Sequence, residues 1–226
     1  MTPPGTTKDQ QPSLPFDPHT NWALAVVDMQ NDFLHGDGYY ARREHEHAPG
    51  AGAGMRSATL PTVVSKVCQA VGTARAWGRP VAFVRAVYDR RFSVIPPGLR
   101  RDPGRVDYPC RPNTWGAEFI EPIAAVVDSA PAAAEQLVID KHTYDAFHDT
   151  QLHEFLQAAK VTHLVVCGTE TQVCVMATAA HATFLGYLCY IVEDAVWAMN
   201  QETANATLEI FRDAYGDTLT AAQLAS

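Results

Sequence analysis

A cysteine follows an apolar segment and a tight turn, a placement in which a thiol can serve as a nucleophile. Residues 163–167 are mostly apolar and run into Gly168, polar residues follow, and then comes Cys174. A helix-like pattern continues to Leu185, so the order predicts a strand, a turn and a helix. Unpaired N–H groups at a helix N-terminus favour an anion and should lower the pKa of the thiol. The alternative is an ordinary buried cysteine of the core.

Two further charged residues stand where apolar segments end. Residues 23–27 run into Asp28, and residues 137–139 are followed closely by Lys141. The carboxyl ends of parallel strands meet at one edge of an open sheet, so these two side chains and Cys174 should converge there. A carboxylate can take the thiol proton, a lysine can hold the resulting charge, and amide N–H groups of the turn can bind an oxyanion. Together they indicate acyl transfer from a planar carbonyl, although each charge alone also suits a strand end.

The elements that must position these residues alternate along the chain. Continuous apolar segments suit strands buried on both faces, and helical patterns separate them. This alternation predicts an α/β fold with three layers, α/β/α, around a mostly parallel, roughly six-stranded, Rossmann-like sheet. Two segments, 36–58 and 88–114, are predicted to be long loops. Predicted strands are 23–27, 81–87, 137–139, 163–168, 188–192 and 218–220, and predicted helices are 60–77, 119–127, 151–159, 173–185 and 201–214.

Composition narrows the class of protein. The 226 residues include 47% hydrophobic and 19% charged residues, with a net charge of -8. This balance suits one folded domain, predicted over residues 21–226, and the negative charge argues against nucleic acid as a partner. No apolar run approaches the roughly 20 residues that span a bilayer, so no membrane partner is expected.

The N-terminus and the cysteines bear on location. Residues 1–20 hold five prolines among polar residues and lack the apolar centre of a signal peptide, which predicts a flexible arm. The five cysteines are scattered, with no CxxC pair, which argues against a disulfide framework and favours a reducing cytoplasm.

Three segments resemble the signatures of one known family. They are Val26-Val27-Asp28-Met29-Gln30-Asn31-Asp32-Phe33, Lys141-His142-Thr143-Tyr144-Asp145-Ala146-Phe147 and Gly168-Thr169-Glu170-Thr171-Gln172-Val173-Cys174-Val175. In this order and separation they are similar to the isochorismatase-like cysteine hydrolases. The resemblance extends over nearly the whole folded part of the chain and implies the same three-layer fold, without specifying a substrate.

The resemblance also assigns roles to residues. It implies a catalytic triad of Asp28, Lys141 and Cys174. It implies a non-proline cis peptide bond between Thr169 and Glu170, and an oxyanion hole formed by the N–H groups of Glu170 and Cys174. A homodimer or homotetramer is expected on the same ground.

Departures from the family pattern refine the expectation. Glu170 stands where many relatives carry a small residue, and Asp145 where many carry serine. Members that cleave the vinyl ether of isochorismate lack the cysteine, so keeping Cys174 favours C–N hydrolysis. Residues 88–92 lack the Asp-x-His pattern through which nicotinamidases bind a metal. The His–Glu alternation of residues 44–47 can bind zinc but also suits a solvated charged stretch, so no metal and no cofactor are predicted.

The pocket wall is expected from residues near the triad. Asn31 is a further candidate to orient a carbonyl, and Arg85, Arg90 and Arg91 could bind a substrate carboxylate. Core packing or a surface position is the alternative for each aromatic or arginine. The predicted substrate-binding residues are Gln30, Phe33, Trp115, Tyr144, Phe147 and Glu170.

These expectations predict a cysteine-dependent amidohydrolase of a small amide, carbamoyl or ureido compound. The Cys174 thiolate would attack the carbonyl, Asp28 would pass the proton to the leaving amine, and water would cleave the thioester. Alternatives are a nicotinamidase-like or cyclic-amide hydrolase and a binding protein of the same fold.

Overall fold

The computed structural model describes residues 16–47, 53–88 and 108–226, with side chains described for all of these except residues 44–47 and 53–57. Its centre is one parallel sheet with the strand order β3-β2-β1-β4-β5-β6. The predicted parallel sheet of about six strands is therefore confirmed. The strands are β1 (Trp22–Val27), β2 (Val81–Ala86), β3 (Gln136–Lys141), β4 (His163–Thr169), β5 (Leu188–Trp197) and β6 (Asp217–Leu219).

Strand β1 lies at the middle of the sheet and is buried along its whole length. Successive side chains of a strand point to opposite faces, and those of β1 divide accordingly between two apolar clusters. Leu24 and Val26 belong to one cluster, and Ala25 and Val27 to the other. A continuous apolar sequence is what a strand covered on both faces requires.

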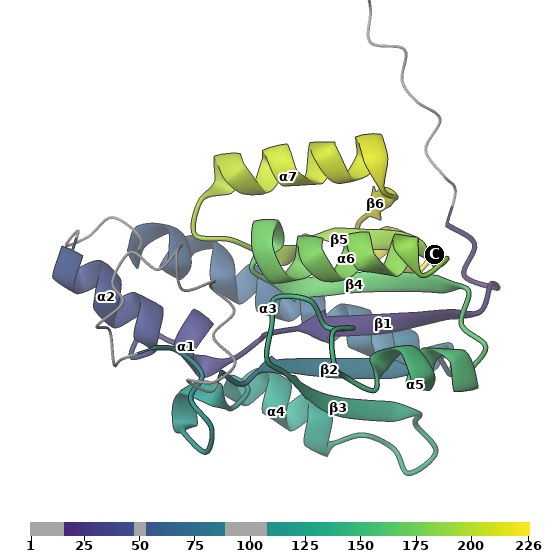
Figure 1. The fold of residues 1–226 in the computed structure, drawn as a ribbon, viewed down its shortest axis with the longest axis horizontal. Coiled ribbons are helices and arrows are strands. Elements are labelled where there is room, and N and C mark those ends of the chain that lie inside the picture. The colour runs from purple at the N-terminus through teal and green to yellow at the C-terminus, as the bar shows by residue number, and fades with distance from the viewer. Residues whose placement is uncertain (1–15, 48–52, 89–107) are drawn as a thin grey trace, which may run out of the picture.

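Helices cover both faces of the sheet and complete the three layers. Side chains of α3, α4 and α8 join the cluster of Leu24, whereas those of α5, α6 and α7 join the cluster of Val27. Figure 1 shows α6 across the front of the sheet and α3 behind it. The helices are α1 (Asn31–Leu34), α2 (Tyr39–His47), α3 (Ala53–Ala76), α4 (Glu121–Asp128), α5 (Leu152–Ala158), α6 (Met176–Phe184), α7 (Gln201–Ala214) and α8 (Ala221–Leu224).

The prediction of a long loop over residues 36–58 is wrong. That segment contains α2 and the start of α3. The charged composition of α2 gave no apolar stripe to detect, and Pro61 inside α3 favoured a later helix start because proline usually occupies the first turn. Helix α2 lies at the end of the sheet to which the strands point (Figure 1).

Other predictions fall partly outside the described residues. The predicted arm, residues 1–20, is described only from residue 16, and the predicted loop 88–114 only at residue 88 and from residue 108. Within the described residues, no helix combines the length and the apolar character needed to cross a membrane.

Candidate active site

Asp28, Lys141 and Cys174 meet at the carboxyl edge of the sheet. Asp28 follows β1, Lys141 ends β3, and Cys174 lies in a π-helical turn, Thr171–Val175, that connects β4 to α6. The Lys141 Nζ atom lies 2.8 Å from Asp28 Oδ2 and 3.4 Å from Cys174 Sγ. Asp28 and Lys141 have no exposed surface and Cys174 only 3%. The convergence that parallel topology predicts is present.

Lys141 is the cation of this cluster, and its third hydrogen bond runs to the Thr143 carbonyl at 2.9 Å. Burial alone would lower its pKa, but the negative charge of Asp28 and the nearby Cys174 outweigh burial and raise it. The amine therefore stays protonated. For Asp28, burial is the largest influence and raises the pKa above its ordinary value, against the opposing effect of Lys141.

The resting thiol of Cys174 is neutral, which corrects the lowered pKa predicted from its place before a helix. Burial raises the pKa of Cys174, and the facing Asp28 carboxylate raises it further, while Lys141 opposes both. A thiolate here would be a buried charge placed beside the negative carboxylate of Asp28, and both conditions favour the neutral thiol. The geometry pairs a protonated thiol with a carboxylate that can accept its proton.

The turn that carries Cys174 is held by close backbone packing. Gly168 has a φ of +117°, and an added Cβ would lie 2.1 Å from the Val27 carbonyl oxygen, so only glycine fits between β1 and β4. Beyond it, the hydroxyls of Thr169 and Thr171 both donate to the Trp197 carbonyl, at 3.2 and 3.1 Å. The turn is thereby fixed to the end of β5.

Glu170 lies directly before this turn. The peptide bond between Thr169 and Glu170 is cis, as the family resemblance implies. The Glu170 carbonyl accepts hydrogen bonds from the N–H groups of Val173 and Val175. Its carboxylate accepts one from Gln172 Nε2 at 2.7 Å, which fixes a negative charge close to the nucleophile.

Three tyrosines have pKa values that respond to the nearby thiol. Burial is the main cause that raises the pKa of Tyr40, Tyr88 and Tyr144, and the nearby Cys174 raises each further. Only Tyr144 was predicted from sequence. Tyr88 follows β2 at the same sheet edge, a position that could have revealed it, whereas Tyr40 lies in the segment predicted as a loop.

Gln30, predicted to bind substrate, is instead occupied by backbone groups. Its Nε2 donates to the carbonyls of Ala86 and Ala117 at 2.8 and 2.7 Å, and its Oε1 accepts from the Ala86 N–H at 2.7 Å. Both amide hydrogens are used, so Gln30 ties the end of β1 to β2 and to the segment before α4.

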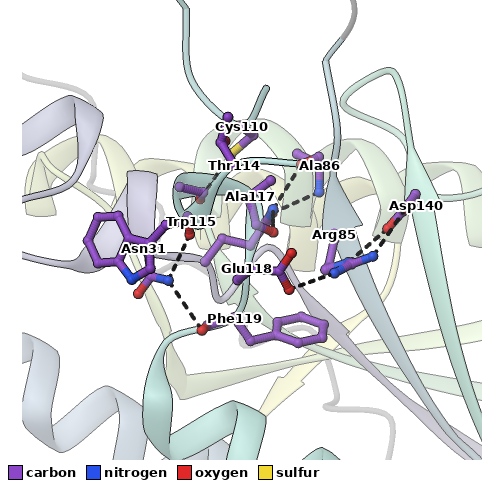
Figure 2. Close-up of polar contacts among 12 residues, drawn as sticks. Asn31, Arg85, Ala86, Cys110, Thr114, Trp115, Ala117, Glu118, Phe119 and Asp140 are labelled. Carbon is purple, nitrogen blue, oxygen red and sulfur yellow. Dashed lines mark hydrogen bonds and ion pairs between the residues drawn. The ribbon is translucent and has the colours of Figure 1, made fainter. Parts of the chain in front are cut away.

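Asn31 has the same structural function. Its side chain donates to the carbonyls of Trp115 and Phe119 at 2.9 and 3.4 Å, and Figure 2 shows it directed toward this segment. Asp32 accepts from the N–H groups of Tyr39 and Cys110 at 3.0 and 2.7 Å. We refer to Gln30, Asn31 and Asp32 as the polar knot.

The remaining aromatic candidates take different positions. Phe33 is buried and stacks on Tyr40 with ring centroids 5.5 Å apart. Phe147 is buried in the core and stacks on Tyr187, as the core alternative expects. Trp115 is half exposed, in a short 3-10 helix, Trp115–Ala117.

Arg85 does not face the triad as a free cation. It binds Asp140 through two hydrogen bonds of 2.8 and 3.2 Å and Glu118 through one of 3.0 Å (Figure 2). Arg90 and Arg91, the other arginines considered for a substrate carboxylate, lie outside the described residues.

The described residues do not fit a metal centre. Among them, no group of three His, Cys, Asp or Glu side chains is placed to hold a metal ion. The side chains of His45 and His47 lie outside this set, although their backbone belongs to α2 and not to a loop.

Comparisons with known proteins agree with this fold. The chain is 31% identical over 191 residues to a ureidoacrylate amidohydrolase, RutB, of Pantoea ananatis (strain LMG 20103), covering 80% of this chain and 71% of that protein. N-carbamoylsarcosine amidase from Thermoplasma acidophilum superposes with a TM-score of 0.65 at 26% identity, over 89% of this chain and 97% of that one. A pyrazinamidase of Pyrococcus horikoshii in complex with zinc superposes with a TM-score of 0.66 at 25% identity, over 88% of this chain and 99% of that one. The isochorismatase domain model matches residues 22–223, and the chain therefore belongs to the isochorismatase family.

Proposed function

We propose that the chain is a cysteine-dependent amidohydrolase that cleaves a C–N bond of a small amide, carbamoyl or ureido compound. The observation that carries the proposal is the buried contact of the Lys141 amine with both Asp28 and Cys174, at 2.8 and 3.4 Å. The relatives named above support it, because one acts on ureidoacrylate and another on N-carbamoylsarcosine.

The first half-reaction forms a thioester. Asp28 removes the proton from Cys174 as the sulfur attacks the substrate carbonyl, and the protonated Lys141 stabilises the charge that develops. The N–H groups of Glu170 and Cys174 are proposed to bind the oxyanion. Collapse of the tetrahedral intermediate breaks the C–N bond, and Asp28 returns its proton to the nitrogen, so that ammonia or a small amine leaves.

The second half-reaction restores the enzyme. Asp28, again ionised, takes a proton from water as the hydroxyl attacks the thioester carbonyl. The C–S bond breaks, the sulfur regains the proton from Asp28, and the acid product leaves. The neutral resting thiol fits this cycle, because the proton that Asp28 transfers starts on Cys174.

The test is release of ammonia from a panel of ureido acids, N-carbamoyl amino acids and simple primary amides. We expect Cys174→Ser to lower turnover of the accepted substrate by about 10⁶-fold, the order seen when the nucleophile of a catalytic triad is removed. Cys68→Ser is the matched control, because Cys68 is a free, half-buried thiol of α3. Full turnover by the Cys174 variant would exclude the mechanism.

Hydrolysis of the amide of an aromatic ring, such as nicotinamide, is the second candidate, supported by the pyrazinamidase in complex with zinc among the similar structures. Stoichiometric zinc or iron in the purified chain, together with nicotinamide turnover, would establish it over the ureido or linear amide. Metal-free protein that hydrolyses a ureido acid would exclude it.

We further propose a homo-oligomer in the cytoplasm. Phe184 on α6 and Ile210 on α7 are 75% and 55% exposed, and an interface between copies of the chain would bury these apolar side chains. All five cysteines are free, which suits a reducing compartment. Light scattering of the purified chain measures the subunit number, and a monomer would contradict the proposal.

A further inference from the structure

A cavity lies beside the polar knot and contains none of the three proposed catalytic residues. Its volume is about 190 Å³, the liquid volume of roughly six water molecules. Its lining includes Asp32, Tyr39, Arg42, Arg111, Thr114 and Trp115. This is room for one small organic ion.

Residues that line the cavity are chain neighbours of residues that lie near Cys174. Tyr39 and Arg111 line it, and burial chiefly raises the pKa of their chain neighbours Tyr40 and Cys110, with a smaller contribution from the nearby Cys174. The Asp32 carboxylate accepts hydrogen bonds from the N–H groups of Tyr39 and Cys110, so it connects two segments that contribute to the lining, and Cys174 is not among the lining residues. A ligand here would not touch the reacting sulfur.

Two arginines give the cavity its charge. In the described part of the chain, neither Arg42 nor Arg111 forms an ion pair with a carboxylate, unlike Arg85 and Arg212. Arg42 donates to the Asp37 carbonyl, and the backbone of Arg111 is held in a turn by the N–H and hydroxyl of Thr114. Two positive groups held near one cavity favour an anion between them.

The lining also restricts the kind of anion. Trp115 is half exposed and meets His35 edge to face at 5.0 Å, while Tyr39 supplies a second aromatic side chain. The Asp32 carboxylate at the cavity disfavours a doubly charged ligand, and its two backbone hydrogen bonds moderate its charge without removing it. A singly charged, planar group matches this combination.

We propose that this cavity is a binding site for a small planar monocarboxylate, separate from the site of amide hydrolysis. The guanidinium groups of Arg42 and Arg111 hold the carboxylate, and Trp115 and Tyr39 flank the planar part. The proposal does not depend on the identity of the substrate cleaved at Cys174.

Calorimetric titration of the full chain with benzoate tests it, with acetate and phosphate as comparison anions. We expect benzoate to bind more tightly than either, and Arg42→Gln and Arg111→Gln each to weaken it by about tenfold or more. Arg212→Gln, which alters an exposed, ion-paired arginine of α7, should bind benzoate as the wild type does. Added salt should weaken binding, since the attraction is between charges near the surface.

A Cys174→Ala chain separates this site from the catalytic one. We expect it to bind benzoate with unchanged affinity and to lose affinity when Arg111→Gln is added. Absence of benzoate binding, wild-type affinity in either arginine variant, loss of binding in Cys174→Ala alone, or tighter binding of phosphate would each overturn the proposal. None of these results depends on turnover, so they stand apart from a failure of the proposed function.

Discussion

Two buried polar regions arise from the same short segment after β1, and they use their polar atoms differently. In the polar knot, Gln30, Asn31 and Asp32 direct their hydrogen bonds to backbone groups of other segments. At the triad, Asp28 faces two titratable side chains, Lys141 and Cys174. A buried side chain that binds the backbone fixes a loop, whereas one that faces other titratable groups can exchange a proton with them.

The first test of this difference neutralises the carboxylate of Asp28. Asp28→Asn should lower turnover by about 10³-fold or more, because a general base contributes on the order of 10²–10⁴. Asparagine tolerates the positive φ of 52° at this position, so the backbone should be kept. Steady-state ammonia release measures the effect.

The same variant should also lose stability. Removing one partner of a buried ion pair leaves the Lys141 charge uncompensated, which costs about 3–5 kcal/mol of unfolding free energy. Urea denaturation measures this. Turnover within tenfold of the wild type would show that Asp28, like the polar knot, serves only to hold the structure.

The second test is the pH dependence of Asp28. Its ordinary pKa is 3.8 and burial raises it. Between the two values the folded chain holds a proton that the unfolded chain has lost, so the contribution of Asp28 to the unfolding free energy falls as pH rises through this window. Turnover should rise through the same window, by up to about tenfold per pH unit, because the base must be ionised.

Matched pH profiles of turnover and of unfolding free energy check this opposition. In Asp28→Asn, the rise of turnover and the fall of the unfolding free energy with pH should both disappear between the ordinary and the raised pKa of Asp28. In Asp32→Asn, both should remain. A turnover profile that stays flat from pH 4 upward would remove Asp28 from the proton transfer.

The third test applies the same chemical change to the polar knot. Asp32→Asn replaces one accepting oxygen with an NH₂ group, leaving the N–H of Tyr39 or Cys110 unsatisfied, at about 1–3 kcal/mol. Gly116 packs against this carboxylate, where an added Cβ would lie 2.1 Å from Oδ2, so the site has little room to adjust. Urea denaturation should show the loss, and turnover should change by less than about tenfold. A larger loss of turnover than in Asp28→Asn would mean that Asp32, and not Asp28, is the carboxylate more important for turnover.

The convergence of Asp28, Lys141 and Cys174 could be predicted from sequence because parallel strands bring their carboxyl ends to one edge. Asp28 follows β1, Lys141 ends β3 and Cys174 lies in the turn after β4, and apolar runs reveal buried strands directly. The role of Gln30 could not be predicted, since an amide gives the same pattern whether it meets a ligand or a carbonyl. Its partners, Ala86 and Ala117, carry no side chain that would indicate the contact.

The protonation state of the resting Cys174 thiol could not be predicted from the sequence either. The position of Cys174 before a helix predicts a lowered pKa, but burial and the distance to Asp28 decide the direction, and both depend on tertiary packing. Tyr40 was missed for a related reason, because α2 is helical without an apolar stripe and is brought to the thiol by the contact of Asp32 with Tyr39.

The smallest expected effect concerns Arg85, which sits at the same sheet edge yet belongs to neither region. Arg85→Gln removes contacts with Asp140 and Glu118 at a partly exposed place, so the unfolding free energy should fall by less than about 1 kcal/mol. The KM for a carboxylate-bearing ureido substrate should stay unchanged, because both partners already hold the guanidinium. Initial rates over a range of substrate concentration measure this. A KM raised tenfold with kcat preserved would mean that Arg85 leaves Asp140 to bind substrate. Substrate recognition would then be a third use of a buried or partly buried polar side chain, beside the structural use in the polar knot and the proton transfer proposed at the triad.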